Sequence, residues 1–295
     1  MNKVGLWSIK CAASLVALTP FSLLYLRSDV CFFLMYHLFR YRRKVVRDNL
    51  VKSFPERPAS EIKQIEKRFY HNFCDLFYEF CKKRRMSLDD YRKHVTVANP
   101  ELLQNLYEKG RSVLLVMPHS GNWEWLWHLQ KDISDHHYAA VYKAMKNKTF
   151  DRFIYDMRKM DTVPEEQMIE DKTVVRALVE RKDWRNLIFF LGDQTPRGVE
   201  TDYWTEFLHR DTCWYKGMGK LAKKFDYAVV YARIARERRG YYRVTFETIA
   251  EDPKQFTEDE IVEQYVRHLE RFLEAYPDNW LWSHRRWKHT RPKQA

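Results

Sequence analysis

The residues with the clearest chemical potential lie at 117–124, which read M-P-H-S-G-N-W-E. His119 carries an imidazole that can take up a proton near neutral pH and act as a general base. Glu124 could accept the proton of one ring nitrogen, fix the tautomer and leave the other nitrogen free to take a proton from a substrate. Five residues turn a continuous helix by about 500°, so this pair requires His119 in a turn and Glu124 in the first helical turn. The alternative is a purely structural histidine and glutamate.

The elements on either side of this segment can supply that geometry. Residues 112–117 (S-V-L-L-V-M) form a nearly continuous apolar run, typical of a strand covered on both faces. Residues 122–130 are expected to form a helix. The turn between them lies at the carboxyl end of a strand, where ligands and catalytic groups collect in α/β proteins. The N–H groups of Gly121 and Asn122 would also face the site, at a helix start that favours negative charge.

The rest of the chain predicts an α/β fold with a mostly parallel central sheet flanked by helices. Further strands are expected at 138–145, 186–191, 227–234 and 241–249, and further helices at 149–160, 173–181, 213–225 and 257–275. Residues 40–95 are expected to be helical. They carry an apolar stripe at helical spacing that favours a core-facing helix: Ile62, Ile65, Phe69, Phe73, Leu76, Phe77 and Phe80.

The N-terminal region indicates contact with a membrane. Residues 11–26 carry no charge, and a helix of that length spans about 24 Å, slightly less than a hydrocarbon core of about 30 Å. Residues 4–9 would lengthen it, with Lys10 reaching toward an interface. We expect a membrane helix or a deeply inserted hairpin; a cleaved signal peptide or a buried core helix stays open.

A second apolar stretch, residues 30–39, is followed by five basic residues: Arg40, Arg42, Arg43, Lys44 and Arg47. Such a segment suits an interfacial helix whose basic end lies among anionic head groups and keeps the following domain on the cytoplasmic side. A solvated helix face is the alternative. We therefore assign residues 1–47 to a membrane anchor with a basic interfacial segment, and residues 48–295 to the catalytic domain.

The composition narrows the partners. The formal net charge of +12 suits an anionic partner: nucleic acid, anionic lipid or an acidic carrier protein. A nucleic-acid module is not indicated, because zinc-finger spacing, an RNP-type sequence and a long basic helix are missing from the sequence. A G-x-S-x-G elbow, a phosphate-binding G-x-x-x-x-G-K-[ST] loop and an H-E-x-x-H motif are missing too. The five scattered cysteines favour a reducing cytoplasmic environment.

Several segments together resemble one protein family. H-S-G-N-W-E resembles the H-x4-(D/E) motif of lysophospholipid-type acyltransferases, and in its wording the branch of the lipid A biosynthesis (late) acyltransferases. Residues 42–56, 141–152, 192–194 (G-D-Q) and 280–288 (W-L-W-S-H-R-R-W-K) resemble further blocks of that family, so the similarity covers nearly the whole chain. Residues 200–208 depart from the V-P-F-F-G type run of many members and look like the branch found in Bacteroidota, which leaves the acceptor open.

The resemblance implies a glycerolipid-acyltransferase-like fold and an acyl transfer without cofactor or metal. His119 would deprotonate an acceptor hydroxyl, which attacks the thioester of acyl carrier protein or acyl-CoA. Glu124 would orient His119 and stabilise its charged form. The implied partners are acyl carrier protein, a lipid A precursor or another anionic lipid, and a membrane surface, with no nucleic acid. The implied location is the bacterial inner membrane, with the catalytic domain on the cytoplasmic side.

The same resemblance singles out further candidates for substrate binding. Arg158 could bind phosphate or the oxyanion, or be a solvated helix charge. Asp193 ends a predicted buried strand, and Glu200 falls where mannoside-acyltransferase relatives place an acidic residue near the histidine. Arg285 and Arg286 could engage phosphates, which arginine binds in a bidentate manner, or form salt bridges. Asn122 joins this group through its position beside the site.

Two other functions stay open at this point. The first is acylation of a lysophospholipid, an aminolipid or a glycolipid other than lipid A. The second belongs to a different class, a non-catalytic basic scaffold at a membrane surface. Replacing His119 by alanine separates them, because a scaffold would keep its function.

Overall fold

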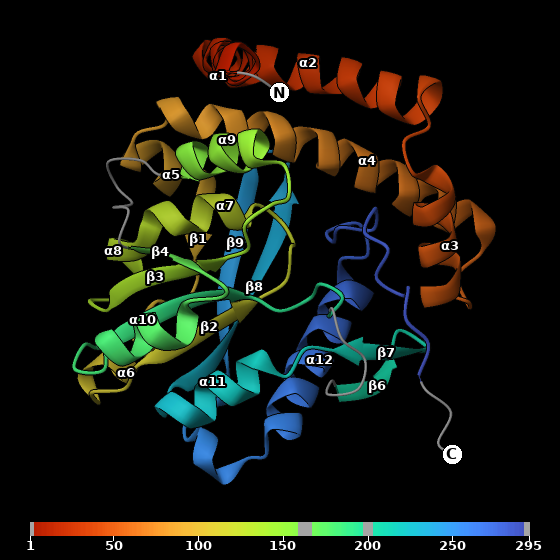
Figure 1. Ribbon diagram of the computed structural model, residues 1–295. Helices are drawn as coiled ribbons and strands as arrows, with labels where there is room; N and C mark the ends of the chain where they lie inside the picture. Colours follow the sequence, from red (N-terminus) through yellow and green to blue (C-terminus); the bar gives the residue numbers. More distant parts are fainter. Residues whose placement is uncertain (1–2, 159–166, 197–202, 292–295) are drawn as a thin grey trace.

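A seven-stranded sheet forms the centre of the molecule (Figure 1). The computed structural model describes residues 3–158, 167–196 and 203–291. The strand order is β1-β9-β8-β2-β5-β3-β4, and all neighbours are parallel except β8 and β9. The strands are β1 (Val95–Val97), β2 (Val113–Met117), β3 (His137–Tyr142), β4 (Met168–Glu170), β5 (Asn186–Leu191), β8 (Ala228–Arg238) and β9 (Tyr241–Ala250).

Helices cover both faces of this sheet and the edge where the parallel strands end. They are α1 (Lys3–Leu18), α2 (Phe21–Phe33), α3 (Arg43–Ser53), α4 (Ala59–Lys82), α5 (Leu88–His94), α6 (Glu101–Glu108), α7 (Trp123–Leu126), α8 (Gln130–Ile133), α9 (Lys148–Arg158), α10 (Val174–Glu180), α11 (Gly217–Phe225) and α12 (Glu258–Ala275). A π-helical turn, Leu34–Leu38, extends α2, and a 3-10 turn, Lys83–Arg85, follows α4. A separate hairpin of β6 (Tyr203–Phe207) and β7 (Arg210–Trp214) lies near α12.

The buried strand β2 explains how the sheet is held between two helical layers. All five of its residues are buried. Leu114 and Val116 pack into the core cluster that includes α4, α11 and α12, whereas Leu115 and Met117 pack into the cluster that includes α5, α6 and α7. Successive side chains of a strand point to opposite faces, so one apolar run supplies both cores. The prediction of an α/β fold with a mostly parallel sheet is therefore confirmed.

The expected helix over residues 213–225 is wrong at its start, because Cys213 and Trp214 belong to β7 and the helix begins at Gly217. The β6–β7 hairpin was not predicted. Its turn, Leu208–His209, has φ of 49° and 60°, the left-handed values that two-residue hairpins need. Leucine and histidine are not the residues that usually signal such a turn, so the sequence gives no hairpin pattern here.

The uncharged run of residues 11–26 does not form one helix. It is divided between α1 and α2 at Pro20, whose ψ of 152° is extended. Proline has no N–H and disfavours helical geometry in the residue before it, so the chain bends there. Among the described residues, no helix combines the length and apolar character needed to cross a membrane. The proposed boundary at residue 47 falls inside α3 and stays a prediction.

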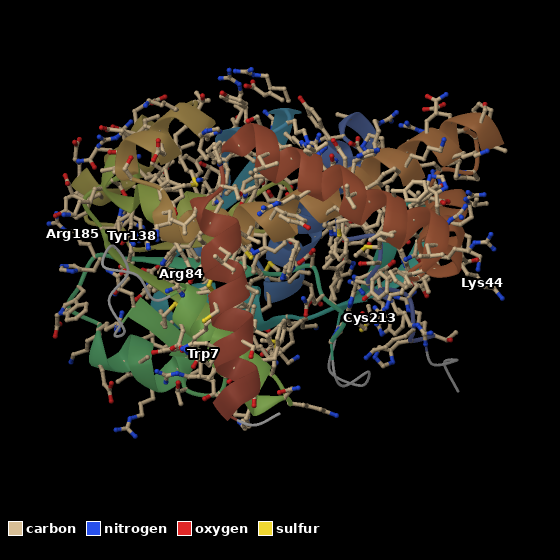
Figure 2. The ribbon with its side chains drawn as sticks, turned by 90° about the horizontal axis from the view of Figure 1, so that it is seen from above. Trp7, Lys44, Arg84, Tyr138, Arg185 and Cys213 are labelled. Carbon is tan, nitrogen blue, oxygen red and sulfur yellow. The ribbon has the colours of Figure 1, made fainter. Side chains whose placement is uncertain are left out.

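The two N-terminal helices lie on the outer side of the molecule, above α4 (Figure 1), and at an angle to each other (Figure 2). They expose large apolar side chains at helical spacing: Trp7, Leu15 and Leu18 on α1, then Leu23, Leu26, Val30 and Phe33 on α2, with Leu34 and Leu38 in the π-helical turn. Trp7 is 68% exposed and Leu26 59%. We call this surface the apolar platform. Single exposed apolar residues are common on protein surfaces, whereas a group of them on two adjacent helices indicates an interaction surface.

Candidate active site

Two neighbouring parallel strands, β2 and β5, bring His119 and Asp193 together. Met117 of β2 lies beside Leu191 of β5 in the sheet register, so both strands end at the same edge. His119 follows β2 by two residues and Asp193 follows β5 by two residues. His119 Nδ1 lies 2.6 Å from Asp193 Oδ1, and the His119 backbone N–H donates to Asp193 Oδ2 at 3.0 Å. The sheet itself thus places a carboxylate against the imidazole.

Asp193 is held in its ionised form. It is buried, and Trp280 Nε1 donates a third hydrogen bond to its Oδ2 at 2.7 Å. Burial alone would raise the pKa of Asp193, but His119 and the hydrogen bonds from His119 and Trp280 outweigh burial and lower the pKa to about 2. An ionised carboxylate only accepts hydrogen bonds. In the neutral imidazole, the His119 proton therefore lies on Nδ1 and the lone pair on Nε2, which lies 3.3 Å from Gln194 Nε2.

The expected pairing of His119 with Glu124 is wrong. Glu124 lies in the first turn of α7 as expected, but its carboxylate accepts from Arg158 Nε at 3.0 Å and from Lys83 Nζ at 3.1 Å. Lys83 is buried in the 3-10 turn that follows α4, and Arg158 is the last residue of α9. Burial would raise the pKa of Glu124, but Arg158 and Lys83 lower it well below its usual range. Glu124 is thus a buried counter-ion that ties α7 to two other helices.

The turn between His119 and α7 has a tightly determined backbone. Gly121 has φ of +52°, and a Cβ there would lie 2.6 Å from Ile234 O, so only glycine fits. The Gly121 N–H donates to Asn279 O at 3.3 Å, which takes up the first of the two N–H groups expected to face an oxyanion. Asn122 caps α7 by accepting from the Trp125 N–H at 3.2 Å, and it is buried. Its side chain therefore supports the turn, which does not fit direct contact with a substrate.

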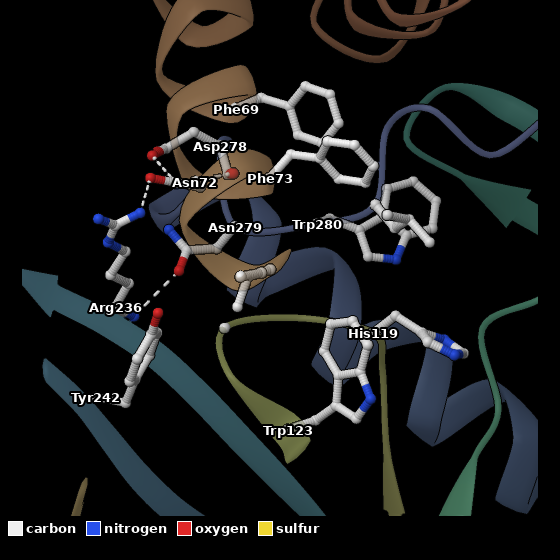
Figure 3. A pocket seen from close by; sticks show the side chains of 13 residues that line it. Phe69, Asn72, Phe73, His119, Trp123, Arg236, Tyr242, Asp278, Asn279 and Trp280 are labelled. Carbon is white, nitrogen blue, oxygen red and sulfur yellow. Dashed lines mark hydrogen bonds between the residues drawn. The ribbon is translucent and has the colours of Figure 1, made fainter. Parts of the chain in front are cut away.

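A small, mainly apolar pocket opens beside His119 (Figure 3). Its lining includes the apolar side chains of Phe69, Phe73, Leu76, Trp123, Trp280 and Leu281, and the polar side chains of Asn72, Arg236, Asp278 and Asn279. The Trp123 ring lies 5.1 Å from the His119 ring. A concave apolar site with a few convergent polar groups is the usual form of a small-molecule site. The imidazole thus forms part of the wall of a mainly apolar pocket.

The remaining predicted site residues differ in how exposed they are. Arg158 lies beside Glu124, as described, and Arg285 is exposed. Arg286 is buried: it donates to Cys213 O at 2.6 Å and stacks over the Trp214 ring, and burial lowers its pKa to about 10. This buried position favours a structural role for Arg286 over a phosphate contact, and the substrate-binding role stays a prediction. Glu200 lies outside the described residues.

Two residues at the site carried no predicted role. Trp280 holds Asp193, and its segment is joined to the His119 turn by an isolated bridge between Ser120 and Trp280. Gln194 directly follows Asp193 in the chain, and its Nε2 lies 3.3 Å from His119 Nε2. Both belong to segments that carried the family resemblance, 192–194 and 280–288. The position of Trp280 and Gln194 in these two segments was the signal in the sequence that could have identified them.

We expect Glu124 to matter for stability. Glu124→Gln leaves Lys83 and Arg158 without their counter-ion, which should cost about 3–5 kcal/mol in urea-induced unfolding. The pKa of Glu124 is lowered in the fold, so the contribution is present above its ordinary pKa and is lost as the pH falls below it.

The matched control for that variant is Glu180→Gln, which breaks the exposed Arg176–Glu180 pair and should change stability by less than about 1 kcal/mol. Equal unfolding free energies for the two variants would contradict the buried counter-ion role.

A comparison with protein families gives a match over nearly the whole chain. The family model described as bacterial lipid A biosynthesis acyltransferase matches residues 2–289. A search of the curated proteins gave no match. The match spans the His119 turn, the strand end that carries Asp193, and the Trp280 segment. On this evidence the chain belongs to the bacterial lipid A biosynthesis acyltransferase family, and is an acyltransferase of that kind.

Proposed function

We propose that the protein transfers a fatty acyl chain from the thioester of acyl carrier protein to a hydroxyl of a lipid A precursor, with His119 as general base. The observation that carries the proposal is the contact between His119 Nδ1 and the buried carboxylate of Asp193, in the wall of an apolar pocket. Asp193 takes the orienting role that the sequence had suggested for Glu124. Such a pair leaves Nε2 with the lone pair that proton abstraction requires.

The proposed reaction needs two proton transfers at one nitrogen. His119 Nε2 takes the proton of the acceptor hydroxyl while the hydroxyl oxygen attacks the thioester carbonyl. The tetrahedral intermediate then expels the thiolate, which takes the proton from His119, so that an ester and a free thiol result. Asp193 stabilises the imidazolium between the two steps. The Gln194 amide, 3.3 Å from Nε2, must move aside to admit the acceptor.

The pocket suits the apolar part of a substrate. Phe69, Phe73 and Leu76 of α4 line it beside His119, and these residues belong to the stripe that was expected to face the core. Phe77 of the same stripe is 59% exposed, so the stripe extends from the core to the surface. We infer that an acyl chain lies along this part of α4. Exposed Arg285, near the Asp193 loop through the contact of its carbonyl with Thr195 Oγ1, is the residue that we propose for a phosphate.

We propose further that the apolar platform lies on the cytoplasmic side of the inner membrane. Its apolar side chains are accompanied by exposed Arg27, Arg40, Arg42 and Lys44, which suit anionic head groups. A lipid acceptor would reach the enzyme from that surface. Acyl-CoA as donor, and a lysophospholipid, an aminolipid or another glycolipid as acceptor, are the alternatives for the same chemistry.

The direct test is turnover by the purified protein. Acyl-carrier-protein and acyl-CoA donors should be compared with a lipid A precursor, and with a lysophospholipid, as acceptors, and the products identified by mass spectrometry. Loss of one acyl group from the lipids of a cell that lacks the protein would identify the natural acceptor. A protein that turns over neither donor would favour the scaffold alternative.

His119→Ala should lower kcat by about 10²-fold or more, since a positioned base contributes that much. Asp193→Asn should lower kcat by about 10³-fold with little change in KM, because the orienting carboxylate is lost while the pocket stays. Steady-state kinetics check both variants. His137→Ala alters an exposed histidine at the opposite end of the parallel strands and serves as control. Wild-type kcat in either site variant would contradict the proposed mechanism.

Leu26→Glu should weaken binding to vesicles of phosphatidylglycerol and phosphatidylethanolamine by about tenfold or more, because it places a charge on the apolar platform. Co-sedimentation measures this binding. The control, Val179→Glu, changes an exposed apolar residue of α10, which lies on another side of the molecule (Figure 1). The platform assignment fails when both variants bind as the wild type does.

A further inference from the structure

Glu79 of α4 is a buried carboxylate that the proposed reaction does not use. It is 0% exposed, and its carboxylate accepts hydrogen bonds from Tyr25 Oη at 2.9 Å, Tyr242 Oη at 2.6 Å and Asn122 Nδ2 at 2.8 Å. Within the part of the chain that the structure describes, Glu79 takes part in no salt bridge. A buried carboxylate is costly unless its acceptors are filled, and here three neutral donors fill them. Burial accordingly raises the pKa of Glu79, against the effect of Tyr242 and Arg236.

The three donors come from three different parts of the molecule. Tyr25 belongs to α2, which carries the apolar platform. Tyr242 belongs to β9, next to the edge strand β1. Asn122 belongs to the turn that begins at His119. Glu79 therefore touches both the helix proposed to face lipid and the turn proposed to do chemistry.

Glu79 also decides how Asn122 is oriented. The Asn122 amide donates through Nδ2 to Glu79 and accepts through Oδ1 from the Trp125 N–H, which caps α7. A reversed amide would direct its NH₂ group at the Trp125 N–H, which is also a donor. The backbone carbonyl of Glu79 makes a second contact, because Trp125 Nε1 donates to it at 3.3 Å. The carboxylate thus fixes the start of α7, three residues from His119.

A second connection runs in parallel one helical turn away on α4. Asp75, fully buried, accepts from Ser28 Oγ of α2 at 2.6 Å and from Arg236 Nη2 at 2.6 Å. The Arg236 N–H donates to Asn279 Oδ1 at 3.0 Å (Figure 3), and Asn279 O accepts from the Gly121 N–H. Asp75 and Glu79 of α4 thus both link α2 to the same turn. The repetition argues against a coincidental contact at Glu79.

We propose that Glu79 is a positioning residue, which orients the His119 turn through Asn122 and ties it through Tyr25 to the lipid-facing helix α2. This inference rests on the proposed function. Binding of α2 to a lipid surface then steadies the turn, so that kcat is higher on vesicles than on the same substrates dispersed in detergent. Small displacements of a catalytic group are enough for such an effect, since about 1 Å costs roughly 10²-fold in rate.

The Glu79–Asn122 contact is tested by exchanging its two chemical groups. Asn122→Asp sets two carboxylates against each other and should lower kcat by about 10²-fold. Adding Glu79→Gln restores the hydrogen bond in reversed order, because the new amide at 79 donates to the new carboxylate at 122. That carboxylate still accepts from the Trp125 N–H and caps α7. The double variant should therefore recover at least tenfold of the lost kcat. A double variant no more active than Asn122→Asp, at equal folded fraction by circular dichroism, overturns the proposal.

The link to α2 is tested by Tyr25→Phe, which removes one hydroxyl outside the catalytic site. The ratio of kcat on vesicles to kcat in detergent should fall toward one, while kcat in detergent stays unchanged. Tyr107→Phe on α6 is the matched control and should keep the wild-type ratio. An unchanged ratio in Tyr25→Phe overturns the link.

The two levels of inference can be told apart by the wild type. A wild-type protein without turnover on any donor and acceptor pair defeats the proposed function, whereas an active wild type with an unrescued double variant defeats only the role of Glu79.

Discussion

The candidate active site depends on one hydrogen bond, between the His119 imidazole and the Asp193 carboxylate, which the sheet brings together. His119 and Asp193 are 74 residues apart in the chain, yet each stands two residues beyond the end of its strand, and the two strands are neighbours in parallel register. The carboxyl ends of parallel strands are where an α/β fold gathers polar groups from distant parts of its chain. Burial of Asp193 would be unfavourable alone. The hydrogen bonds donated by His119 and Trp280 offset the cost of burying the Asp193 carboxylate. The ionised carboxylate in turn determines which imidazole nitrogen can accept a proton from a substrate.

The sequence revealed the strands and the turn more reliably than it revealed the side-chain partners. The runs at 112–117 and 186–191 are continuous apolar segments, and continuous burial is a strong signal for central strands. His119 in the turn after β2 was also predicted. The predicted partner was the nearest carboxylate in the chain, Glu124, because local spacing says nothing about which strand will lie alongside. Register between β2 and β5 is a tertiary property, and it selected Asp193.

The two buried glutamates, Glu124 and Glu79, have different kinds of partners. Glu124 is compensated by cations, Lys83 and Arg158, so its interaction is strong and keeps the carboxylate charged. Glu79 has only neutral hydrogen-bond donors, and burial raises its pKa. Neither environment could be predicted from composition. Lys83 is part of a K-K-R-R run that reads as a solvated charge cluster, yet it is fully buried.

The bend at Pro20 has a consequence for orientation at an interface. A single straight helix lying on a bilayer leaves the body of a protein free to roll about the axis of that helix. α1 and α2 point in different directions on the same side of the molecule (Figure 2), and two lines that are not parallel define a plane. A protein seated on both helices loses that rolling freedom, so the mouth of the cavity beside His119 would stay at a constant height above the head groups.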